Sequence, residues 1–161
     1  MSDKSDLKKL KENYRDIQKK YNLPEFEDLN KYFGIEKVAE VETDYLIREI
    51  RRYISEKLYS YLRFTETLLN PANAPIWIFS VIKTMDGNQK SKISEIYKKL
   101  AENELKLFEI DLNFSEESEA DFIKEGYRLW IEIKKELSDF LNNVKSNWDN
   151  KFEVNNKGYF G

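Results

Sequence analysis

The sequence contains no cysteine and no histidine. The lack of cysteine excludes disulfide bonds, thiolate catalysis and metal sites with cysteine ligands. Without histidine as well, Ser-His and Cys-His nucleophile pairs, histidine acid–base catalysis and ordinary zinc sites are excluded. A ferritin-like di-iron site is excluded too, because it needs Glu-x-x-His pairs on facing helices. We therefore expect neither a metal nor another cofactor.

Phosphate-binding glycine loops and long apolar runs are also missing. Neither G-x-G-x-x-G nor G-x-x-x-x-G-K-[ST] occurs, so the standard nucleotide-binding loops are absent. The longest apolar stretch, residues 74–82, is far shorter than the ~20 residues of a spanning helix. The first residues are charged throughout and lack the apolar segment of a signal peptide. These features predict no membrane partner and a cytoplasmic location.

Turn-forming residues are scarce, with five glycines and three prolines among 161 residues. This scarcity favours long uninterrupted helices over a turn-rich β fold. A hydrophobic fraction of 40% beside a charged fraction of 35% suits an adequate core inside a heavily charged surface. We predict an all-α, single-domain bundle of five or six mostly antiparallel helices, two of them long. The bundle would span residues 1–154, with a short aromatic tail at 155–161.

Apolar residues at steps of three and four predict where the helices lie along the sequence. We expect an amphipathic N-terminal helix within residues 1–22 and an extended stretch at 110–114. Residues 35–42 are interpreted as a linker, with a helical linker as the alternative. The remaining predicted helices cover residues 24–33, 43–69, 75–82, 90–109 and 115–149.

Three residues carry local predictions about helix ends and packing. Gly34 is placed to adopt the left-handed conformation just past a helix. Ser115 is a natural N-cap for the last helix. Gly126 continues the apolar register of that helix, so it predicts a close contact with a neighbouring helix, although glycine costs about 1 kcal/mol against alanine there.

The densest apolar run follows Pro71 and Pro75. Apolar residues between Ile76 and Ile82 point in all directions around a short helix, and a helix that is apolar all round is a buried helix. We therefore expect the buried corner of a hairpin, with Trp77 and Phe79 in the core. The alternative is a partly exposed apolar site for a partner.

One stripe of the long central helix is rich in arginine. Arg48, Arg52, Tyr59 and Arg63 fall within about 60° of each other, opposite the apolar face, with Arg51 at the border. Arginines interleaved with an aromatic are typical of phosphate or RNA contacts. The alternative is a solvated face of local ion pairs with nearby glutamates, which is the more usual outcome.

The two ends of the chain offer two further candidates. The N-terminal helix has a narrow apolar seam and seven Lys/Arg against four Asp/Glu, so it must dock on its own bundle, on a second copy or on another protein. Tyr159 and Phe160 stand between two glycines at the C-terminus. They would fill a pocket on a partner, fold back onto the bundle or stay disordered.

Paired carboxylates are the one catalytic device that the composition leaves. Glutamates at helical spacings far more often belong to solvated helix faces than to catalytic sites. The candidates are Glu95, Glu104, Glu109, Glu132 and Glu136. We therefore expect that the protein is not an enzyme. The sequence favours a protein–protein interaction or adaptor module that binds another protein or itself as a homodimer. The alternative is a nucleic-acid or ribonucleoprotein accessory subunit that uses the arginine stripe.

Overall fold

The computed structural model describes the backbone of residues 3–159 and the side chains of residues 3–148, and this part of the chain contains seven helices and no strand. The all-α prediction is confirmed. The predicted count of five or six is too low, because the expected linker contains a 3₁₀ helix, and three helices rather than two are long. The helices are α1 (Lys4–Tyr21), α2 (Phe26–Phe33), η1 (Ile35–Glu40), α3 (Leu46–Leu69), α4 (Ile76–Thr84), α5 (Gly87–Leu112) and α6 (Glu116–Tyr159).

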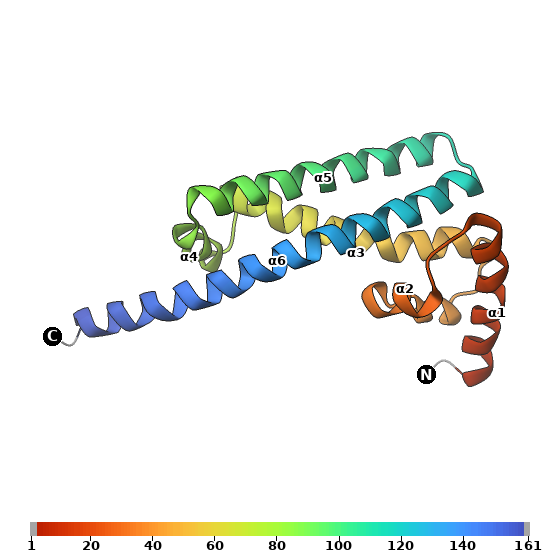
Figure 1. The fold of residues 1–161 in the computed structure, drawn as a ribbon, viewed down its shortest axis with the longest axis horizontal. Coiled ribbons are helices and arrows are strands. Elements are labelled where there is room, and N and C mark those ends of the chain that lie inside the picture. Colours follow the sequence, from red (N-terminus) through yellow and green to blue (C-terminus); the bar gives the residue numbers. More distant parts are fainter. Residues whose placement is uncertain (1–2, 160–161) are drawn as a thin grey trace.

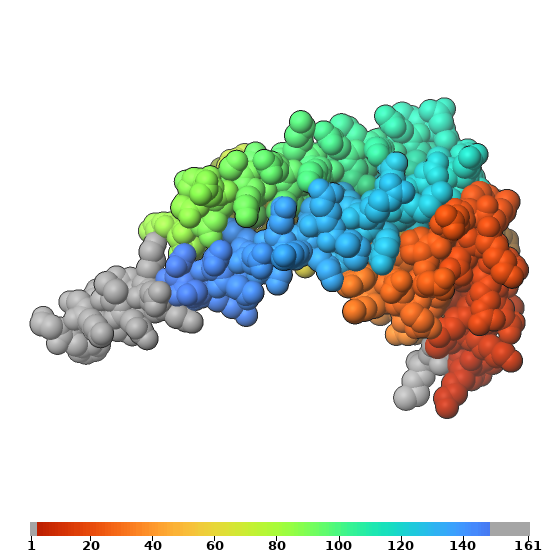
Figure 2. Space-filling view, viewed as in Figure 1, coloured from red at the N-terminus to blue at the C-terminus, as the bar shows by residue number. Residues whose placement is uncertain are grey.

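The three long helices lie side by side (Figure 1). Helix α5 runs antiparallel to α3, and α6 then returns in the direction of α3. The short α4 sits at the end where α5 begins, while α1, α2 and η1 gather at the other end, where they form the orange and red block of Figure 2. Each end of the three-helix unit is therefore covered by different short elements.

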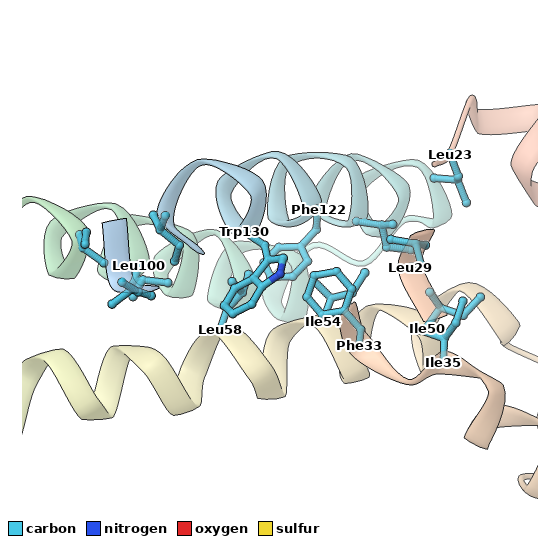
Figure 3. Close-up of a cluster of buried hydrophobic side chains, with 14 of the residues drawn as sticks. Leu23, Leu29, Phe33, Ile35, Ile50, Ile54, Leu58, Leu100, Phe122 and Trp130 are labelled. Carbon is cyan, nitrogen blue, oxygen red and sulfur yellow. The ribbon is translucent and has the colours of Figure 1, made fainter. Parts of the chain in front are cut away.

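The core forms where α3 faces α6 (Figure 3). Ile54 and Leu58 of α3 are buried opposite Phe122 and Trp130 of α6. Gly126 lies between these two α6 residues, and a Cβ atom there would stand 2.8 Å from Cγ2 of Ile54. The predicted close helix contact at this glycine is confirmed.

The predicted helix ends are correct at two positions. Gly34 has φ +65° and follows α2. The hydroxyl of Ser115 accepts a hydrogen bond from the backbone N–H of Ser118 in the first turn of α6. Helix α5 begins at Gly87, where Asp86 and Gln89 form a capping box.

Helix α1 docks on the chain's own fold. It contacts η1, and Leu10 and Tyr14 are buried there. The Tyr14 hydroxyl donates a hydrogen bond of 2.5 Å to the carbonyl oxygen of Pro24. Burial, and secondarily the charge of Glu25, raises the pKa of this phenol above its ordinary value. A helix that is marginal in isolation is thereby fixed by tertiary contacts.

The segment predicted to lie extended, residues 110–114, instead completes α5 as far as Leu112. Ile110 is buried, whereas Leu112 and Phe114 are exposed. Phe108 is exposed as well. The described helices include none with both the length and the apolar character to cross a membrane.

Candidate interaction surface

The exposed arginines of α3 are held by local partners. Arg52 donates to Glu49 over 3.0 Å and to Glu56 over 3.4 Å, as the solvated-face interpretation predicts. Arg63 donates to the Tyr59 hydroxyl over 3.4 Å. The charge of Arg52 is therefore partly neutralised, and one hydrogen-bond donor of Arg63 is already occupied.

Arg51 and Arg48 converge on one buried carboxylate from α6. Glu119 is only 1% exposed, and Nε of Arg51 lies 2.6 Å from its Oε2 atom. Nε of Arg48 lies 3.6 Å from Oε1, and the Arg48 guanidinium also stands 4.3 Å from the ring centre of Phe114. Arg51 was placed at the border of the stripe, but its side chain is turned into the protein. This cluster joins α3 to α6 and leaves Arg51 no access to a ligand.

A hollow of about 380 Å³ lies between α3 and α5 beside Tyr59 and Arg63. Leu62 and Leu105 contribute apolar surface, while Glu104 adds a carboxylate. Burial raises the pKa of Glu104 above its usual range, and the charge of Asp111 adds to the effect. The hollow thus combines apolar walls with a charged rim.

A continuous apolar stripe runs from this hollow along α5. Its members, which we call the α5 stripe, are Ala101, Leu105, Phe108 and Leu112, at steps of four, three and four. At 100° per residue they fall within an arc of about 60°. Leu105 is 64% exposed, Phe108 59% and Leu112 81%. Three large apolar side chains on one helix face are therefore left in water, which is typical of a docking surface.

Four carboxylates border the α5 stripe, and we call them the acidic border: Glu102, Glu104, Glu109 and Asp111. Glu104 and Asp111 lie on the side toward α3, while Glu102 and Glu109 lie on the opposite side. Glu102 is 4.0 Å from Lys98. Within the described residues, the other three members form no ion pair. Carboxylates therefore flank the apolar surface on both sides.

A second exposed apolar surface is formed by α4, and it overturns the prediction of a buried corner. Trp77 is 51% exposed and Phe79 43%, while Ile76 is almost fully in water. Only Ile78 and Val81 of this helix are buried. The reason is geometric: α4 packs against α3 and α6 on one side only, so the rest of its surface faces solvent.

Three of the other predicted glutamates, Glu95, Glu132 and Glu136, lie around Lys99. Glu132 accepts a hydrogen bond from Lys99 across α5 and α6. This bond raises the pKa of the lysine, and the charges of Glu136 and Glu95 add smaller contributions. A groove of about 940 Å³ beside α1 is lined by carboxylates such as Asp6 and Asp16. In the part of the chain that the structure describes, no three Asp or Glu side chains are placed to hold a metal ion.

The C-terminal candidates fall at the limit of the described chain. The backbone of α6 is helical as far as Tyr159, beyond the predicted end near residue 149. The Tyr159 side chain and all of Phe160 lie outside the described residues, so the partner-binding prediction for this tail stays a prediction.

Comparisons with known proteins add no family to this description: no family model, no curated protein and no solved structure matches the chain. The sequence pattern indicated Tyr59 and Arg63 but not the α5 stripe beside them. A signal was present, because α5 carries two apolar rows, and only one of them is needed for the core.

Proposed function

We propose that this protein is a non-enzymatic interaction module that binds another protein on the face formed by α3 and α5. The observation that carries the proposal is the α5 stripe, whose three large side chains are exposed on one face of the C-terminal half of α5. Burying apolar surface contributes about 25 cal/mol per Å², so a partner covering these side chains gains free energy. The adjacent hollow offers a place for one anchoring side chain. A cytoplasmic setting is part of the proposal and rests on the sequence alone.

Affinity purification from the source cells tests the proposal when a stripe variant is compared with a matched control. The stripe variant is Leu105→Ser with Leu112→Ser, and both positions are exposed enough to tolerate the change. The control is Ile76→Ser, an equally exposed apolar position on α4. We expect the stripe variant to lose a partner that the wild type and the control retain, with unchanged circular dichroism. Identical partner sets for all three proteins would contradict the proposal.

The alternative function is a nucleic-acid accessory subunit. Its support is the run of Arg52, Tyr59 and Arg63 along an accessible face of α3. Two features weaken that support. Arg52 is paired with glutamates, and the acidic border of α5 lies close to these arginines, so phosphate groups would be repelled. Binding of mixed RNA and DNA at low salt, lost on Arg52→Glu with Arg63→Glu, would favour this alternative over protein binding.

A further inference from the structure

We propose that the partner segment on the α5 stripe is an amphipathic helix whose apolar face is bordered by lysine or arginine. This inference rests on the proposed function and adds the chemistry of the partner. It is carried by two features of the same face, the geometry of the stripe and the charge that surrounds it.

The geometry of the face fits a helix. The α5 stripe spans eleven residue steps, or about 16 Å of helix axis. Its steps of four, three and four match the seam with which one helix meets another. The hollow beside Tyr59 and Leu62 continues the same surface onto α3, so an incoming helix would lie against two antiparallel helices. That arrangement would extend the three-helix unit by one member.

The acidic border selects the charge of that helix. Border positions beside an apolar seam set partner choice through ion pairs, as e and g positions do in coiled coils. Here the three carboxylates of Glu104, Glu109 and Asp111 have no cation of their own among the described residues. Burial, and secondarily the charge of Asp111, raises the pKa of Glu104, so a cation brought beside these two carboxylates would relieve their mutual repulsion. A helix with lysine or arginine beside its apolar face supplies those cations.

Two other occupants fit this face less well. In a second copy of the chain, two α5 helices packed stripe to stripe would bring acidic border against acidic border, which is repulsive in either orientation. The chain's own basic helix, α1, is already docked on η1 with Leu10 and Tyr14 buried. Neither a homodimer through α5 nor a rearranged α1 is therefore favoured.

The test uses two fluorescent peptides and the full chain. Each peptide has three heptads with Leu at a and d and Gln or Ala at b, c and f; one carries Lys at e and g, the other Glu. We expect the Lys peptide to bind at least about tenfold more tightly than the Glu peptide at low salt. This preference should shrink as salt is raised toward about 0.15 M, because the border charges are exposed.

Two variants of the protein separate the contributions. Leu105→Ser with Phe108→Ser removes apolar anchors and should weaken the Lys peptide by about thirtyfold or more. Glu104→Gln with Glu109→Gln and Asp111→Asn removes border charge and should abolish the preference for Lys over Glu. Circular dichroism of both variants checks the fold. Trp77→Ser on α4 is the matched control and should bind both peptides as the wild type does.

The outcomes separate this inference from the proposed function. Equal binding of both peptides, lost in the Leu105 and Phe108 variant, would overturn the basic partner and leave a docking face on α5. No binding of the Lys peptide at about 100 µM, an affinity that a three-turn contact should reach, would also overturn it. The proposed function itself fails only if the variant Leu105→Ser with Leu112→Ser keeps every cellular partner. If the protein forms a concentration-dependent dimer, and Leu105→Ser with Phe108→Ser abolishes it, the face would instead be assigned to a second copy.

Discussion

Replacing Glu119 by leucine should destabilise the protein strongly. Its carboxylate is 1% exposed and accepts hydrogen bonds from Arg51, itself 8% exposed, at 2.6 and 3.5 Å. Leucine is of similar size, so the change leaves little cavity but removes the only carboxylate that contacts Arg51 among the described residues. An uncompensated buried charge costs about 3–5 kcal/mol. For a chain of this length that corresponds to a fall of about 6–20 °C in Tm.

Urea unfolding followed by circular dichroism measures this cost, and two further variants show its cause. The pair Arg51→Met with Glu119→Leu removes both charges and should recover to within about 1–2 kcal/mol of the wild type, because an apolar pair of similar volume replaces an ion pair almost neutrally. Arg52→Ala breaks only exposed ion pairs and should cost less than about 1 kcal/mol. The midpoints should move while the slope m stays constant.

Two results would refute this reasoning. If Glu119→Leu costs no more than Arg52→Ala, the buried cluster does not contribute as its geometry implies. If the double variant is as unstable as the single one, the loss comes from the shape of the side chain and not from the stranded charge of Arg51.

Three other predictions follow from single positions. Trp77→Ala should lower the free energy of unfolding by about 1–2 kcal/mol in urea, because half of the side chain is in water. A fully buried tryptophan would cost about 3–5 kcal/mol, and a loss of that size would support the buried-corner prediction instead. Gly126→Val should lower stability by about 1–3 kcal/mol, since the new side chain meets Ile54, and an unchanged midpoint would contradict that contact. Glu104→Gln should raise Tm slightly at neutral pH, because a raised carboxyl pKa means that the charged form is disfavoured in the folded state; the gain should vanish below about pH 4, where the unfolded group is also protonated. A gain that persists in acid would assign it to a cause other than charge.

Local chemistry was predictable from the sequence wherever a single residue decides it. Gly34 ends α2 in the left-handed region and Ser115 caps α6, because each satisfies backbone groups within its own turn. The end of α5 was mistaken because residues 109–114 alternate between apolar and polar, a pattern shared by a strand and by a helix with two apolar rows. Only tertiary packing separates the two.

Burial was not predictable for α4. The rule that an all-apolar helix is buried assumes neighbours on every side, and α4 has them on one side. The pairing of Arg51 with Glu119 had no local signal either, because the two residues are 68 positions apart. Arg52, Tyr59 and Arg63 of the predicted stripe are exposed, but their local hydrogen bonds and the apolar neighbour on α5 depend on side-chain contacts that spacing alone does not fix.

The two exposed apolar surfaces differ in how well they would discriminate between partners. Apolar contact supplies affinity but little selectivity, because many apolar faces satisfy it equally. The α4 surface, with Ile76, Trp77 and Phe79, has only Lys83 as a charged residue within its helix. The α5 stripe is enclosed by four carboxylates, so an acidic helix of the same shape would be repelled and a basic one attracted. A surface that rejects as well as attracts has what a specific binding site needs, and on that ground the α5 stripe is the stronger site.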